Sequence, residues 1–240
     1  MSKMIALESV VEQVKTCFVD RDVYFSPNEL PANVIIPAEW KEFGAVFSEK
    51  PKFPAAWNSF ADKLPWVLSL LDTCLVGTFV LGGEKVELLY VFHDANGLYY
   101  YTGGLPLTSC LLRSDKINLI AGRLSDFYLH VHNGFTFFSA QSMGPQKIED
   151  FSCVADLIDE EETSFAASWV TVFSNGGGDY LVVDINNHAE DKGIIWWHEQ
   201  PVEPELGIDV FEVMDTWMSI FLEDTQSRSD VLIEESKFKT

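Results

Sequence analysis

The sequence predicts an α+β fold, built from a mainly antiparallel, twisted sheet with flanking helices at the N-terminus, in the middle and at the C-terminus. Apolar residues recur at helical spacing over residues 2–18, 115–131 and 210–222. Strand-like runs follow one another over residues 73–103 and 169–199 and are separated by turns that contain Gly and Asn. Because the strands come in groups and do not alternate strictly with helices, an antiparallel sheet is favoured over a parallel one.

The first 112 residues are expected to form a helical N-terminus followed by β-hairpins. After the first helix, residues 38–47 predict a short helix and residues 54–71 predict a longer one. Pro65 lies within the longer helix and should kink or divide it, because proline lacks the amide hydrogen that a helix interior needs.

Two consecutive hairpins are predicted over residues 73–103. Gly82-Gly83 and Asn96-Gly97 separate three β-rich runs, and both pairs favour the positive φ angles of tight hairpin turns. The run LPLTSCLL at residues 105–112 is expected to add a fourth strand.

In the second half, Asn133-Gly134 should end the helix at residues 115–131 and lead into the strand FTFF. Residues 151–157 predict a short helix. Three further strands are expected from the runs WVTVF, DYLVVDI and IIWWHE, and a strongly amphipathic helix at residues 210–222 follows them.

We expect a single α+β domain over residues 1–224, because no linker rich in Pro, Gly or Ser divides this chain of 240 residues. The domain would consist of residues 1–112 and residues 113–224. Residues 225–240 are expected to form a polar tail.

The charge of the chain is strongly negative and unevenly distributed. Its 37 acidic and 16 basic residues give a net charge of −21. Residues 1–120 carry 14 acidic and 10 basic residues, whereas residues 121–240 carry 23 and 6, a net charge of −17. A field of this sign repels nucleic acid and anionic membranes and speeds the encounter with basic proteins. We therefore expect a basic protein partner, no nucleic acid and no membrane; solubility alone is the alternative explanation.

Motifs that carry catalysis or bind cofactors are missing from the sequence. It contains no GxSxG, HExxH or DxDxDG pattern, and its four cysteines lie far apart without a CxxC pair. The loop NGGG at residues 175–178 leads into a strand and not into a helix, so it predicts a hairpin turn instead of a phosphate loop. We expect no catalytic residue, no metal site, no cofactor and thus no enzyme; an enzyme with unrecognised chemistry is the competing hypothesis.

The sequence also predicts a cytoplasmic location. The N-terminal residues lack the basic run and the unbroken apolar stretch of a secretory signal. The most apolar stretch, residues 64–81, is interrupted by Pro65, Asp72 and Gly77, so we expect it to lie in a protein core and not in a membrane. The four cysteines are accordingly expected to be buried, reduced thiols.

Candidate partner-binding residues lie in the acidic half. The four acidic residues at 159–162 are expected to be solvated surface. Successive side chains of a strand point to opposite faces, so one face cannot bury both Trp196 and Trp197, although a helix over the second face would bury both. An exposed tryptophan beside charged residues would be a natural interface anchor. The predicted partner-binding residues are Asp159, Glu160, Glu161, Glu162, Asp179, Asp184, Trp196 and Glu199.

Several short motifs of the second half occur in a distinctive order. Asn133-Gly134 ends a helix, Gly178-Asp179 precedes a strand that Asp184 closes, and Gly193 and Trp197 lie in the next strand. Over residues 117–224 this order resembles the SUKH superfamily, a group of α+β proteins that includes fungal cell-wall-synthesis regulators and many bacterial immunity proteins.

Similarity to this family implies a non-catalytic binding role, without catalytic residues or a cofactor. The role is most often that of an immunity protein that inhibits a toxin, frequently a nuclease, from a bacterial polymorphic-toxin or contact-dependent system. A nuclease has a basic substrate cleft, which an acidic surface is suited to occupy. The alternative is an intracellular regulatory or scaffold protein of the same fold that binds a cellular protein, and the sequence leaves the oligomeric state open.

Overall fold

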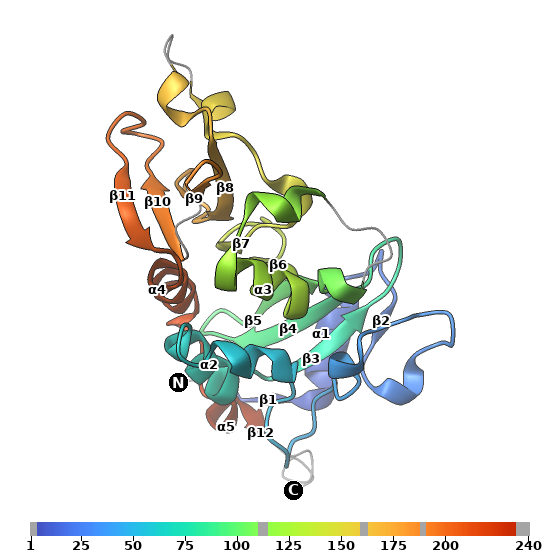
Figure 1. Ribbon diagram of the computed structural model, residues 1–240. Helices are drawn as coiled ribbons and strands as arrows, with labels where there is room; N and C mark the ends of the chain where they lie inside the picture. The colour runs from blue at the N-terminus through green and yellow to red at the C-terminus, as the bar shows by residue number, and fades with distance from the viewer. Residues whose placement is uncertain (1–3, 110–114, 159–162, 188–190, 234–240) are drawn as a thin grey trace, which may run out of the picture. The chain divides into compact units, whose positions relative to one another are not determined.

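The computed structural model describes residues 4–109, 115–158, 163–187 and 191–233, and its helices and strands are labelled in Figure 1. Helices accompany two antiparallel sheets and one short parallel strand pair, which confirms the predicted α+β class. The chain forms two compact units. Unit 1 comprises Met1–Leu105 and Phe221–Thr240, and unit 2 comprises Pro106–Ile220. The C-terminal part of the chain thus returns to the unit in which the chain begins.

The helices of unit 1 are shorter than the sequence predicts. Strand β1, Ile5–Ala6, replaces the first turn of the expected N-terminal helix, and α1 then spans Leu7–Cys17. Pro65 divides the helix expected at residues 54–71, because α2 begins at this proline and spans Pro65–Cys74. The 3-10 helices of this part are η1 at Pro27–Glu29, η2 at Ala38–Trp40 and η3 at Ala55–Phe60. The prediction of a helix over residues 38–47 is therefore wrong beyond its first turn.

The antiparallel sheet of unit 1 contains the two predicted hairpins. Its strands run in chain order as β2 (Val23–Tyr24), β3 (Gly77–Leu81), β4 (Glu87–His93) and β5 (Leu98–Gly104). The strand predicted at residues 105–112 is wrong as far as the structure describes this segment. Leu107–Ser109 forms a 3-10 turn, η4, in which the Ser109 N–H donates to the Pro106 carbonyl at 2.8 Å.

Residues 225–233 pack into unit 1, so the prediction of a polar tail is wrong for this part; residues 234–240 of the predicted tail lie outside the described residues. Helix α5 spans Arg228–Val231, and strand β12, Leu232–Ile233, pairs in parallel with β1. Val231 is fully buried, and Leu232 is 4% exposed. The residues around this apolar triplet are polar, so composition alone predicts a tail. Burial of the three apolar side chains nevertheless stabilises the packed segment.

Unit 2 contains a five-stranded antiparallel sheet, helix α3 and most of helix α4. The sheet order is β11-β10-β9-β8-β7. The strands of this sheet are β7 (Gly144–Pro145), β8 (Trp169–Ser174), β9 (Tyr180–Asp184), β10 (Lys192–Trp196) and β11 (Glu205–Asp209). Strand β6 (Asn133–Phe137) also lies in unit 2 but is not part of this sheet. The runs WVTVF, DYLVVDI and IIWWHE form β8, β9 and β10 as predicted, whereas the sequence does not predict β11.

The helical segments of unit 2 are more broken than expected. The helix predicted at residues 115–131 begins as a 3-10 helix, η5 (Asp115–Leu119), and continues as α3 (Gly122–His130). The helix predicted at residues 151–157 is the 3-10 helix η7 (Val154–Leu157), which lies between η6 (Ile148–Asp150) and η8 (Ser164–Ala166). The closing helix α4 spans Val210–Leu222, close to its predicted bounds.

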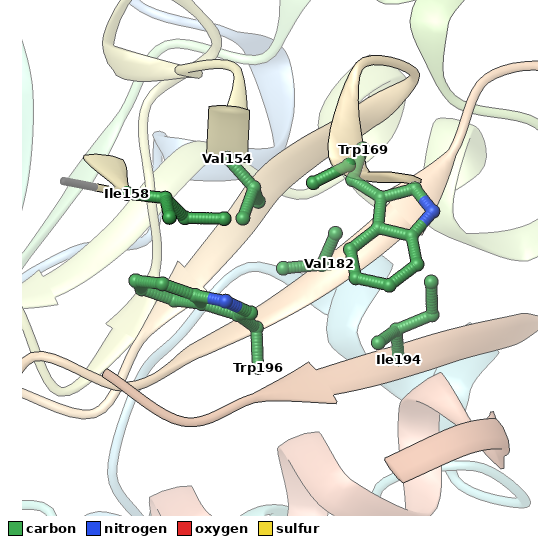
Figure 2. Close-up of a cluster of buried hydrophobic side chains, with 7 residues drawn as sticks. Val154, Ile158, Trp169, Val182, Ile194 and Trp196 are labelled. Carbon is green, nitrogen blue, oxygen red and sulfur yellow. The ribbon is translucent and has the colours of Figure 1, made fainter. Parts of the chain in front are cut away.

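Both faces of strands β8, β9 and β10 are covered within unit 2. On one face, Val182, Ile194 and Trp196 lie against Val154 and Ile158 in a buried cluster (Figure 2). On the other face, the rings of Phe173 and Trp197 lie 5.6 and 6.3 Å from the ring of Trp217 on α4. The sheet is thus enclosed between the segment that carries η7 and η8 and helix α4.

Two further observations concern the exposure of the cysteines and the length and apolar character of the helices. Of the cysteines that the structure describes, Cys74 is buried, Cys153 is half-buried and Cys17 is exposed, so the expectation of buried thiols is wrong for Cys17. None of the helices in the described ranges has both the length and the apolar character that a transmembrane span requires.

Candidate functional site

The motif residue Asn133 fixes a distant loop of unit 2 to the start of β6. Its Oδ1 accepts a hydrogen bond from the Ile148 N–H at 2.9 Å, and its Nδ2 donates to both carboxylate oxygens of Glu149, at 2.9 and 3.2 Å. Gly134 has φ +77°, and a Cβ there would lie 2.7 Å from the backbone nitrogen of Lys147. This pair of residues is thus required by the local backbone.

Asp179 joins the turn after β8 to the segment that follows β10. Its Oδ1 accepts the backbone N–H of His198 at 3.1 Å and lies 2.8 Å from Nδ1 of the same residue, while Asn175 Nδ2 donates to its Oδ2 at 2.7 Å. Burial acts to raise the pKa of Asp179, but the hydrogen bonds from His198 and Asn175 outweigh it and hold this pKa below its ordinary value. The carboxylate therefore holds two turns together.

Asp184 has a similar local role at the end of β9. Its Oδ1 accepts hydrogen bonds from the Ser168 hydroxyl at 2.7 Å and from the Asn186 N–H at 3.0 Å. Gly193, in the facing strand, permits close packing, because a Cβ there would lie 2.7 Å from a methyl carbon of Val210 and 2.9 Å from the Val182 carbonyl oxygen. Asp184 and Gly193 thus shape the sheet.

Trp196, which the sequence analysis places at the interface, is buried. Its side chain is 3% exposed and belongs to the cluster in Figure 2, and its indole N–H donates to the Pro201 carbonyl at 3.2 Å. The prediction that it contacts a partner is corrected on this point, because the η7–η8 segment covers one face of the sheet while α4 covers the other. The indole instead fixes the connection between β10 and β11.

Of the remaining predicted partner-binding residues, the structure describes Glu199 but not the acidic run at residues 159–162. Glu199 is exposed in the connection between β10 and β11, and its predicted contact with a partner stays a prediction. The run Asp159, Glu160, Glu161 and Glu162 lies outside the described residues.

Several other side chains near Glu199 in the sequence are also exposed. We call residues 192–209 the acidic hairpin; they comprise β10, β11 and the connection between them. Glu203 and Glu205 are exposed, and the apolar side chains of Val202 and Leu206 are 63% and 66% exposed. Acidic and apolar side chains are thus exposed together along this connection and the start of β11, where only Glu199 was predicted from the sequence.

A sequence signal for this surface exists. Between residues 193 and 220 there are six acidic residues and no Lys or Arg. The prolines at 201 and 204 obscure the hairpin, since they discourage a strand prediction.

The connection of the acidic hairpin is well ordered by hydrogen bonds. The Gln200 N–H donates to the Trp197 carbonyl at 3.1 Å, and the Glu203 N–H donates to the Gln200 carbonyl at 3.0 Å. Together with the Trp196 indole and the Asp179 carboxylate, these bonds hold the connection at several points. A preorganised surface loses little conformational entropy when a partner binds.

Two observations in the described part of unit 2 concern metal ligands and cavities. No group of three or more His, Cys, Asp or Glu side chains in the described ranges is arranged to hold a metal ion. A cavity beside Asp184, Asp191 and Lys192 has a volume of about 20 Å³, which is room for about one water molecule.

No protein-family model, curated protein or solved structure matches the chain. The relationship to the SUKH superfamily stays a prediction from the motifs of the second half.

Proposed function

We propose that the chain is a non-catalytic cytoplasmic binding protein of the SUKH kind, which neutralises a cognate bacterial toxin by occupying a basic surface of that toxin, such as the substrate cleft of a nuclease. The observation that carries this proposal is the charge of unit 2. Its 115 residues, Pro106–Ile220, include 19 acidic and 5 basic residues, a net charge of −14, whereas unit 1 has a net charge of −7. The same unit holds the motifs that resemble the SUKH superfamily.

We place the proposed contact surface on the acidic hairpin. Glu199, Glu203 and Glu205 are exposed on a connection whose backbone is fixed by Trp196 and Asp179. Exposed apolar side chains between acidic ones supply contact area that a purely charged surface lacks. A basic partner would be attracted by the charges and retained by the apolar contacts.

The proposal predicts that a toxin is encoded directly upstream of this gene, and the test is co-expression with that toxin. The chain should restore growth of cells that produce the toxin, and the purified proteins should form a complex at moderate salt. Association should slow as salt is added, because screening weakens electrostatic steering. Failure of both rescue and complex formation would contradict the proposal.

Two matched triple variants test whether the charges that speed association with the toxin lie on the acidic hairpin. Glu199→Gln, Glu203→Gln and Glu205→Gln together should slow association with the toxin about tenfold at low salt. Glu8→Gln, Glu12→Gln and Glu39→Gln remove the same number of exposed charges from unit 1 and should leave the rate nearly unchanged. Equal effects of both triple variants would show that total charge, and not unit 2, governs binding.

The alternative, a regulatory or scaffold protein of the same fold, predicts a different result. A complex with a cellular protein, formed without any effect on toxin-producing cells, would favour it.

A further inference from the structure

Strand β11 is an end strand of its sheet and exposes much of its surface. In the described part of unit 2 it pairs only with β10, so its other edge carries backbone N–H and C=O groups that no strand of that sheet uses. Glu205, Leu206 and Gly207 are all exposed. Open edges of this kind pair readily with an added strand unless they are guarded.

The charged side chains near this edge of β11 would favour one kind of added strand over another. Lysine, which commonly protects edge strands, is missing between residues 193 and 209, and the acidic residues Glu203 and Glu205 take its place. A second copy of the chain would bring like charges together across the edge, which disfavours pairing. A strand that carries lysine or arginine would meet opposite charges instead.

The register of β11 shows what such a strand would contact. Leu206 pairs with Ile194 and Glu205 pairs with Ile195. Paired residues of neighbouring strands share a face of the sheet, so Leu206 extends the face of the buried cluster that contains Ile194. Glu205 lies on the opposite face, because side chains alternate along a strand. An added strand would thus place an apolar side chain beside Leu206 and a basic one beside Glu205.

We propose that the outer edge of β11, together with Val202 and Glu203, docks an extended basic segment of a partner protein, which joins the sheet as an additional strand. The inference rests on the proposed function for the identity of the partner as a basic protein, and it assigns the surface and the mode of recognition. The register shift of the β10–β11 pair limits the added ladder, because Gly207, with φ +72°, interrupts regular pairing. Side-chain contacts at Val202, Glu205 and Leu206 therefore contribute much of the affinity.

The test uses the full chain and two synthetic nine-residue peptides, one of alternating lysine and valine and one of alternating lysine and serine. Binding is followed by NMR, which reports both the affinity and the amide groups that respond. The lysine–valine peptide should perturb the amides of residues 202–206 and should bind about tenfold more tightly than the lysine–serine peptide.

Variants on the exposed edge test the contacts without disturbing the core. Leu206→Asp should weaken binding of the lysine–valine peptide about tenfold or more, and Glu203→Lys with Glu205→Lys should weaken it similarly. Glu8→Lys with Glu12→Lys on α1 makes the same change of charge in unit 1 and should alter the affinity less than about twofold.

Three results would overturn the inference: equal binding of both peptides, perturbations confined to other parts of the chain, or a dimer in sedimentation experiments that Leu206→Asp dissociates. Loss of peptide docking with toxin rescue intact would reject this edge and leave the proposed function standing. Docking at the edge without toxin rescue would reject the toxin and retain the edge.

Discussion

Two arginines of unit 1 and three short side chains of unit 2 hold connections of the chain in different ways. In unit 1, Arg21 donates to the carbonyls of Gly82 and Lys85, at 2.7 and 2.6 Å, and so fixes the turn between β3 and β4. Arg228 donates to four carbonyls, those of Val46, Phe47, Glu49 and Val76. Each guanidinium satisfies several carbonyl groups outside the helices and strands, which suits its fan of five donors.

In unit 2, several connections are held by side-chain oxygens that accept hydrogen bonds from backbone N–H groups. Asn133 accepts from the Ile148 N–H, and Asp179 accepts from the His198 N–H. Asp209 caps helix α4 by accepting two backbone N–H groups of its first turn, at 2.9 and 3.2 Å. Unit 2 also contains donors, since Lys116 donates to two carbonyls in the way that the arginines of unit 1 do and the Trp196 indole donates to the Pro201 carbonyl.

The acidic side chains of unit 2 therefore have two different roles. Part of the acidity of unit 2 is used within the unit, since Asp179, Asp184 and Asp209 all accept local hydrogen bonds. The acidic side chains that are exposed on the acidic hairpin are the glutamates at 199, 203 and 205. Aspartate is short enough to reach neighbouring backbone groups, whereas glutamate extends further from the chain. Net charge alone therefore overstates the size of the candidate interface.

The largest effect is expected when the arginine that fastens unit 1 is removed. Arg228→Ala leaves four carbonyls without their donor and should lower the free energy of unfolding by about 3 kcal/mol. Hydrogen exchange at Val231 and Leu232 should accelerate, because α5 and β12 lose their attachment. Asp230→Ala on the same helix is the control and should change stability by less than about 0.5 kcal/mol. Equal stability of the Arg228→Ala protein and the wild type would contradict a fastening role.

The corresponding change in unit 2 removes an acceptor. Asn133→Ala leaves the buried Ile148 N–H without its partner and should lower the free energy of unfolding by about 2 kcal/mol. Chemical denaturation measures the loss, with Asn187→Ala at an exposed position as the control. Exchange of the Ile148 amide should accelerate in the Asn133→Ala protein alone. An unchanged exchange rate there would show that Asn133 does not hold this loop.

Much of the fold follows from local signals in the sequence. Gly82-Gly83 and Asn96-Gly97 identify the two hairpins of unit 1, because tight turns need residues that accept positive φ. Pro65 marks the start of α2 for an equally local reason, since proline is tolerated in the first turn of a helix. These features are decided by a few neighbouring residues.

The failures occur where distant residues decide the structure. Strand β11 is short, follows two prolines and contains a glycine, so only its pairing with β10 reveals it. The segment that contains β12 looks like a tail until β1 and Arg228 are placed beside it. Trp196 looks like an interface anchor, but burial depends on the η7–η8 segment, more than 25 residues away.

The smallest expected effect is a difference in pH dependence. The stability that the Asp179 carboxylate contributes should depend on pH, whereas the stability that the Arg228 guanidinium contributes should not. The folded-state pKa of Asp179 is lowered, so its carboxylate contributes stability that is fully present above the pKa of the unfolded chain, about 4. This contribution is lost as the pH falls through the lower folded-state pKa. Asp179→Asn should therefore cost about 1 kcal/mol at pH 7, and its difference from the wild type should shrink below about pH 4. The cost of Arg228→Ala should not shrink in this way, because a guanidinium keeps its charge throughout. Denaturation of the three proteins from pH 7 to pH 3 gives the comparison, and parallel curves for Asp179→Asn and the wild type would show that the carboxylate charge does not hold His198.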